Sequence, residues 1–240
     1  MSAVVFTVAD NNYLPYAKML EKSFKKFHPD IEFVVFGKRD LNGLGISEPY
    51  YRNKAFFGEQ LQREYDTVVN IDADSIVVGD LTDIFNANYD AGSVYNNFDP
   101  DPLGRELIKI WDMQAPEYVN AGLVAGKSMR FWSWWKKLCL SHHYPHYQFR
   151  EQDMLNIIFS YGDLHTVNFD TSHGIYGLYL NGYWPQAVLE NGEIVLPEGV
   201  LDKRKTWKIL HWAGGAGAKK MNYRTRFSAE VADRIEELIS

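Results

Sequence analysis

The distribution of apolar residues over the first half of the chain predicts alternating strands and helices. Residues 4–9 and 31–36 are short apolar runs typical of buried strands. Between them, Pro15 suits the first turn of a helix, and His28-Pro29-Asp30 ends it. The apolar face of that helix is formed by Tyr16, Leu20, Phe24 and Phe27. A strand, a helix and a second strand in this order predict a βαβ unit with parallel strands.

Similar patterns predict the elements of the remaining chain. Strands are expected directly before Asp72 and at residues 91–95, 119–125 and 207–212, and helices at residues 52–64, 103–111, 129–140 and 151–161. A closing amphipathic helix is marked by Phe227, Val231, Ile235 and Leu238. Residues 169–197 are rich in Gly, Tyr and Asn without clear periodicity, and we expect loops and hairpins around a site there.

These elements predict an α/β fold with a mixed, mostly parallel sheet flanked by helices. A chain of 240 residues can form one large domain with a sizeable core. No linker, change of composition or internal repeat divides it. We therefore expect a single domain over residues 1–240.

Composition and charge narrow the class of protein. Hydrophobic residues make up 46% of the chain, which indicates a folded protein. The net charge of −6 argues against a broad nucleic-acid-binding face, so nucleic acid is not an expected partner. The single cysteine, Cys139, excludes an internal disulfide and is expected in the core. Because no basic leader precedes the first strand and no apolar run reaches membrane-spanning length, we expect a cytoplasmic protein.

The most informative motif is Asp72-Ala73-Asp74, which directly follows an apolar strand. In open α/β sheets, side chains at the carboxyl ends of the strands face the crevice where ligands bind. Carboxylate oxygens at that place suit a divalent cation that holds a diphosphate. A second copy, Asp99-Pro100-Asp101, is interleaved with prolines and predicts a solvated turn. The first copy therefore predicts a metal-dependent nucleotide-sugar site.

Six separated segments share their order with a known family. They are residues 9–13 (Ala-Asp-Asn-Asn-Tyr), Lys54, Asp72-Ala73-Asp74, residues 118–122 (Tyr-Val-Asn-Ala-Gly), residues 151–156 (Glu-Gln-Asp-Met-Leu-Asn) and residues 211–214 (His-Trp-Ala-Gly). In this order they resemble the retaining family 8 glycosyltransferases of the GT-A fold, a group that includes glycogenin and bacterial lipopolysaccharide galactosyl- and glucosyltransferases.

The resemblance implies a nucleotide-sugar-binding half over about residues 1–125 and an acceptor-binding half, with a closing metal and phosphate loop, over about residues 126–240. The residues implied at the donor are Ala9, Asp10, Tyr13, Lys54, Asp72, Ala73, Asp74, Asn120, Gly214 and Lys219. Among them, Asp10 and Tyr13 would hold the uracil by a polar contact and an aromatic face. Lys54, or its neighbour Arg52, would lie on the diphosphate or a donor hydroxyl.

A metal site formed by Asp72, Asp74 and His211 is also implied. An imidazole nitrogen beside carboxylate oxygens suits Mn²⁺ better than Mg²⁺, which is the alternative. The phosphate-binding lysine of the family would fall at position 217, which here is Gly217; Lys219 and Lys220 arrive two and three residues later. Either the glycine-rich loop brings Lys219 to the β-phosphate, or this contact has changed.

The implied activity is transfer of a hexose from a UDP-sugar to a hydroxyl of a glycan, glycolipid or protein, with retention of anomeric configuration. The implied catalytic residues are Glu151, Gln152, Asp153 and Asn120. Glu151 stands where the family usually has Asp. Glu151 and Asp153 are chemically capable nucleophiles and Gln152 is a poor one, whereas a front-face path needs no protein nucleophile.

Two other functions stay open on the sequence. The displaced lysine leaves room for a non-catalytic nucleotide-sugar-binding protein of the same fold. A sugar nucleotidyltransferase would normally have a glycine-rich, basic loop after the first strand, and Asp10-Asn11-Asn12-Tyr13 is not one. Trp132, Trp134 and Trp135 could form a membrane-surface patch, but their helical spacing predicts a division between core and surface. The expected partners are a nucleotide-sugar donor and a carbohydrate acceptor.

Overall fold

The structure is a computed structural model that describes residues 2–43, 53–95, 118–142, 144–146, 149–169, 185–198, 205–212 and 221–240. Several sequence predictions lie outside these residues: the helix at 103–111, the turn at 99–101, Arg52, Gly214, Lys219 and Lys220. Among the described residues, none of the helices combines the length and the apolar composition that crossing a membrane would need.

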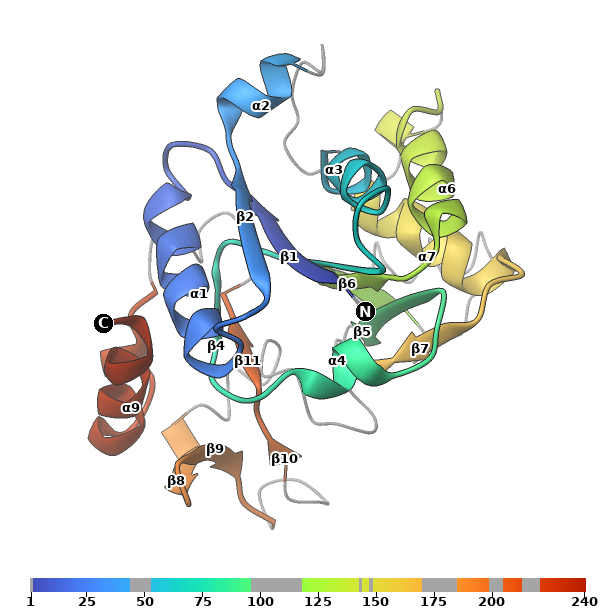
Figure 1. Ribbon diagram of the computed structural model, residues 1–240. Helices are drawn as coiled ribbons and strands as arrows, with labels where there is room; N and C mark the ends of the chain where they lie inside the picture. The colour runs from blue at the N-terminus through green and yellow to red at the C-terminus, as the bar shows by residue number, and fades with distance from the viewer. Residues whose placement is uncertain are drawn as a thin grey trace.

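A six-stranded sheet forms the centre of the molecule (Figure 1). Its strands are β1 (Ala3–Val8), β2 (Glu32–Phe36), β3 (Thr67–Ile71), β5 (Ala91–Tyr95), β6 (Val119–Gly126) and β7 (Thr166–Asn168), in the order β2-β1-β3-β6-β5-β7. Strand β1 is parallel to β2 and β3, and β5 is parallel to β7, whereas β6 is antiparallel to both of its neighbours. The sheet is thus mixed and mostly parallel, which confirms the predicted fold class.

Helices cover both faces of this sheet (Figure 1). Helix α1 (Leu14–Phe27) packs on one face through Leu20 and Phe24. The other face is covered by α3 (Asn53–Leu61), α6 (Met129–Cys139) and α7 (Glu151–Tyr161), with Trp132 and Trp135 among the largest buried side chains. Trp134 is only partly buried and Cys139 is buried, so the predicted division of the tryptophans and the predicted core cysteine are confirmed. Two short helices, α2 (Lys38–Gly43) and α4 (Thr82–Asn86), follow β2 and the short strand β4 (Ser75–Val77).

A smaller layer is built around β4 (Ser75–Val77) and β11 (Ile209–His211), which pair antiparallel. The predicted strand 207–212 is shorter than expected because the chain changes partner: Trp207 N donates to Ile194 O, and Lys208 O then accepts from Val78 N. Strands β8 (Val188–Glu190), β9 (Glu193–Leu196) and β10 (Lys205–Thr206) form a three-stranded sheet. The hairpin of β8 and β9 contributes Ile194 and Leu196 to an apolar cluster, so this described part of residues 169–197 serves the core.

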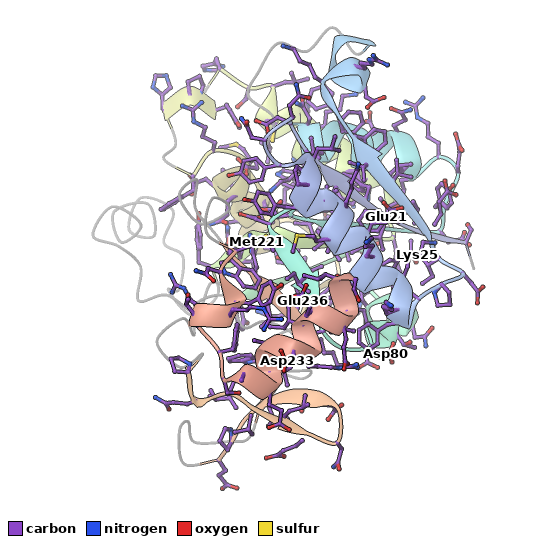
Figure 2. The ribbon with its side chains drawn as sticks, turned by 90° about the vertical axis from the view of Figure 1, so that its left-hand side faces the viewer. Glu21, Lys25, Asp80, Met221, Asp233 and Glu236 are labelled. Carbon is purple, nitrogen blue, oxygen red and sulfur yellow. The ribbon has the colours of Figure 1, made fainter. Side chains whose placement is uncertain are left out.

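Helix α9 (Ala229–Ile239) covers the outer side of this smaller layer. Ser228 caps its start by accepting a hydrogen bond from Val231 N. Figure 2 shows α9 beside α1, with the labelled Asp233 and Glu236 on α9 and Glu21 and Lys25 on α1. Two short 3₁₀ turns, Tyr144–His146 and Tyr223–Thr225, complete the described elements.

Candidate functional site

The candidate site is built where β3 ends. All five residues of β3 are buried, and backbone hydrogen bonds hold the two aspartates that follow. Asp72 N donates to Gly122 O at 2.8 Å, which extends the pairing with β6. Asp74 O accepts from Trp212 N at 2.9 Å, which joins this turn to the end of β11. The motif is therefore fixed between two strands that lie far away in sequence.

His211 completes a cluster with these aspartates. It pairs with Ser75 across β4 and β11, and this register brings its Nε2 atom to 3.1 Å from Asp74 Oδ1 and 3.7 Å from Asp72 Oδ2. One ligand atom from each of the three residues lies within 4.8 Å of the others. His211 and Asp74 are buried, while a quarter of the Asp72 side chain is exposed. The ligand atoms of the three predicted metal-binding residues thus lie close together, and Asp72 is the one that is exposed to solvent.

The donor set fits a divalent metal. Metal–ligand bonds of about 2.1 Å place neighbouring ligand atoms roughly 3–4 Å apart, which is close to the separations found here. Two carboxylates and one imidazole form a mixed oxygen and nitrogen set, which first-row transition ions accept readily. The residues therefore suit a divalent cation, and they do not by themselves fix which ion binds.

Lys54 is buried beside this cluster. Its Nζ atom lies 2.6 Å from Asp72 Oδ1, 3.7 Å from Glu151 Oε1, and donates to Ala121 O at 3.1 Å. Burial lowers the pKa of Lys54, but the carboxylates of Asp72 and Glu151 outweigh burial and the net shift is upward. The ammonium is therefore charged at neutral pH and is held by three protein groups.

A β-bulge in β6 provides some of these contacts. The register between β5 and β6 shifts after Ser93: Ser93 pairs with Val124, and Val94 pairs with Asn120. Asn120 is buried, and its Oδ1 atom accepts a hydrogen bond from Gly122 N at 2.7 Å, which fixes the bulge locally. The bulge turns Ala121 O toward Lys54 and Gly122 O toward Asp72 N.

Glu151 stands at the start of α7 next to Lys54. Trp135 Nε1 donates to Glu151 O at 2.9 Å, which fixes this end of the helix against α6. Burial raises the pKa of Glu151 to about 7, although the nearby Lys54 ammonium opposes the shift. Burial thus makes this carboxyl group easier to protonate than an exposed glutamate.

Gln152 and Asp153 are engaged by protein groups. Gln152 Oε1 accepts from Ala121 N at 3.0 Å. Asp153 Oδ1 accepts from the Tyr118 hydroxyl at 2.6 Å, and Oδ2 accepts from Phe149 N at 2.7 Å. Burial raises the pKa of Asp153, and these hydrogen bonds only partly offset it. The hydrogen bonds of Asp153 therefore hold the chain where it enters α7.

That entry has an unusual backbone. Arg150, directly before α7, has a φ of 48°, a value that non-glycine residues rarely adopt. Asn156, in the second turn of α7, accepts from Val119 N at 2.7 Å and donates to Val119 O at 2.9 Å through its side-chain amide. The amide ties α7 to β6 and so holds Glu151 in its place beside the bulge.

The turn after β1 lies on the other side of the aspartates. Asp10 Oδ1 accepts from Asn12 N and Tyr13 N at 2.8 and 3.0 Å, which closes a turn. Ala9 and Ala73 share a small buried cluster, against which the half-buried Tyr13 packs. Burial and the charges of Asp74, Asp10 and Asp72 raise the pKa of Tyr13. The structure thus brings the β1 turn and the aspartate motif together.

Most of the residues predicted to bind the donor or the metal, among those that the structure describes, lie together at the end of β3. The sequence missed the backbone carbonyls of Ala121 and Gly122 and the hydroxyl of Tyr118. Only the Tyr-Val-Asn-Ala-Gly segment pointed to this region, and no sequence pattern specified a bulge there. Gly214 and Lys219 lie outside the described residues, so they stay predictions.

Known proteins resemble this chain in structure. No protein-family model matches it, and no curated protein matches its sequence. A structure of the galactosyltransferase LgtC in complex with donor and acceptor sugar analogs has a TM-score of 0.62 at 19% identity, covering 98% of this chain and 95% of that one. The bifunctional glycosyltransferase WbbM gives a TM-score of 0.68 at 18% identity, and this chain spans 50% of it. The glycosyltransferase GlyE of Streptococcus pneumoniae TIGR4 gives a TM-score of 0.61 at 16% identity, and this chain spans 61% of it. The matches to WbbM and GlyE each cover all of this chain.

Structural similarity to these proteins, at such low sequence identity, establishes the fold of this chain. The chain has the GT-A fold of these glycosyltransferases, formed as a single domain with a mostly parallel sheet.

Proposed function

We propose that this protein is a metal-dependent, retaining glycosyltransferase of the family 8 type, which transfers a hexose from a UDP-sugar to a hydroxyl acceptor. The observation that carries the proposal is the convergence of Asp72, Asp74 and His211 at the end of β3, within a fold shared by glycosyltransferases. LgtC, whose structure contains donor and acceptor sugar analogs, matches over nearly its full length. We assign the donor to about residues 1–125 and the acceptor to about residues 126–240.

Asp72, Asp74 and His211 would hold Mn²⁺, which when bound neutralises charge on a departing diphosphate. In the transfer, the bond between the anomeric carbon and the β-phosphate oxygen breaks and a bond to the acceptor oxygen forms. On a front-face path the acceptor hydroxyl passes its proton to the β-phosphate oxygen of the departing UDP, so no protein base is needed. Tyr13, beside the two aspartates, would border the uracil, and Asp10 would shape the turn that presents it.

Of the two predicted carboxylate candidates, Glu151 is the better suited to meet the donor sugar. Both oxygens of Asp153 already accept hydrogen bonds from protein groups. Glu151 lies 3.7 Å from Lys54, whose ammonium also contacts Asp72. We therefore assign Glu151 to the reacting centre, Asp153 and Gln152 to the support of α7, and Asn120 to the support of the β6 bulge.

Asp74→Asn tests the proposal. UDP release from UDP-glucose, UDP-galactose and UDP-N-acetylglucosamine is measured with Mn²⁺ or with chelator, in the wild type and the variant. We expect release with one donor to require Mn²⁺ and to fall at least about 100-fold in the variant, because a metal ligand is lost. The exposed Asp163→Asn, on a surface ion pair with Arg130, is the matched control and should keep wild-type activity.

Other outcomes would replace the proposal. Tight UDP binding without turnover would identify a non-catalytic nucleotide-sugar-binding protein. Release of pyrophosphate from a nucleoside triphosphate and a sugar phosphate would identify a nucleotidyltransferase. An inverted anomeric centre in the product, seen by NMR, would contradict retention.

A further inference from the structure

Lys54 has an arrangement that ligand binding alone does not require. An ammonium group has three donors, and here Asp72 and Ala121 accept from Lys54 at 2.6 and 3.1 Å while Glu151 faces it at 3.7 Å. The side chain is only 9% exposed. Its protein partners therefore occupy the ammonium before any ligand arrives.

The Lys54 ammonium forms its closest ion pair with Asp72, one of the predicted metal ligands. Asp72 directs Oδ1 to Lys54 and Oδ2 to His211, so the carboxylate is shared between the lysine and the metal site. Asp74, the other carboxylate, has its Oδ1 atom 3.1 Å from His211. The two carboxylate ligands carry two negative charges, and Lys54, which also faces Glu151, offsets part of the charge of Asp72. A divalent cation would thus meet a partly neutralised ligand set.

We propose that Lys54 is a positioning residue that withholds one oxygen and one charge of Asp72 from the metal, so that the cation binds weakly until a nucleoside diphosphate supplies further oxygens and charge. This inference rests on the proposed function, since it concerns the same site. It makes metal binding depend on the donor, and it leaves the protein without a tightly bound metal between turnovers.

Neutral replacements of Lys54 test this inference. Mn²⁺ is titrated into the wild type, Lys54→Met and Lys54→Gln, with and without UDP, and free Mn²⁺ is read from its electron paramagnetic resonance signal. We expect the neutral variants to bind Mn²⁺ alone about tenfold tighter or more, because a repelling charge next to a ligand is gone. The factor by which UDP tightens Mn²⁺ binding should shrink correspondingly. A titration of Mn²⁺ with UDP alone corrects for their association in solution.

Two controls separate charge from packing. Lys54→Arg keeps the positive charge and should bind Mn²⁺ alone within about threefold of the wild type. Lys136→Met removes a lysine that pairs with Glu59 at 2.5 Å, between α6 and α3 and outside the candidate site, and should leave Mn²⁺ binding unchanged. If Lys54 merely supported the fold, its neutral variants would bind Mn²⁺ less tightly as their stability fell.

Each outcome has one meaning. Mn²⁺ affinity that is unchanged or weaker in a folded neutral variant overturns the inference. If neither neutral variant folds, the wild type still decides: equal Mn²⁺ affinity with and without UDP contradicts the inference, and tightening of about tenfold or more by UDP supports it. A wild type that binds no Mn²⁺ even with UDP would refute the proposed metal-dependent function itself.

Discussion

At the scale of the single residue, His28 is a buried histidine outside the candidate site. Its Nε2 atom accepts a hydrogen bond from Leu81 N at 2.9 Å and lies 3.3 Å from Asp80 Oδ1. Burial lowers the pKa of His28; the nearby Asp80 carboxylate opposes this shift, and Lys208 adds slightly to it. An accepting Nε2 atom requires the neutral imidazole, so the folded state favours the uncharged form.

We therefore expect stability to fall at mildly acidic pH. The unfolded chain protonates His28 near its ordinary pKa of about 6.5, whereas the folded protein resists protonation. The stabilisation is fully present above that pKa and is lost as pH falls through the lower pKa of the folded state. The free energy of unfolding is measured by urea denaturation at pH 7.5 and at pH 5.5. Its loss between these two pH values should be smaller in His28→Gln than in the wild type, because the glutamine does not titrate and its amide oxygen can still accept from Leu81 N. An equal difference in both proteins would contradict this role.

At the scale of elements, close packing of α3 against α6 fixes the helix that carries Lys54. Gly58 of α3 faces the indole of Trp132, and a Cβ atom at this glycine would lie 2.1 Å from Trp132 Cε3. Trp132 also packs next to Gly126 of β6. The absence of two side chains thus lets a large indole fill the space between helices and sheet.

Gly58→Ala should destabilise the protein although alanine favours helices. The gain in helix propensity is about 1 kcal/mol, but a contact of 2.1 Å cannot be relieved without moving a buried indole. We expect a net loss of about 2 kcal/mol or more, measured by urea denaturation. Adding Trp132→Leu should reduce the penalty of the alanine in a double-mutant cycle. Gly37→Ala, with its nearest neighbouring atom at 3.8 Å, is the matched control and should be nearly neutral.

At the scale of the whole molecule, β4 joins the main sheet region to the C-terminal layer. Val77 belongs to the cluster under α1, while Ile76 and Val78 belong to the cluster under α9. Ile235 of α9 is fully buried in the latter cluster. Because one short strand serves two cores, we expect the two layers to unfold together.

Ile235→Ala tests this coupling. The substitution should cost about 2–5 kcal/mol through lost burial and a residual cavity. Tryptophan fluorescence and far-UV circular dichroism should still report a single, coincident unfolding transition. Two separate transitions would show instead that the C-terminal layer unfolds independently. The exposed Glu237→Ala, which loses only a surface ion pair with Arg234, should change stability by less than about 0.5 kcal/mol.

The sequence by itself determined much of the fold. Strand β5 and helix α7 begin and end where the apolar patterns predict, and the other predicted elements among the described residues differ mainly at their ends. The sequence also indicated Asp72 and Asp74, because an apolar strand directly precedes them, whereas His211 was indicated only by the resemblance to family 8 glycosyltransferases. The short elements β7, α2 and α4 were missed, since a few residues carry too little periodicity to predict an element.

Tertiary structure decided what these residues contact. Lys54 meets Ala121 across 67 positions of sequence, and that contact depends on a bulge set by the pairing of β5 with β6. The partners of Asp153 likewise come from the docking of α7 on β6. Local sequence patterns report which side chains are buried, since burial follows the period of the element. The partner of a buried polar group depends on strand register and helix docking, which are fixed only when the whole chain has folded.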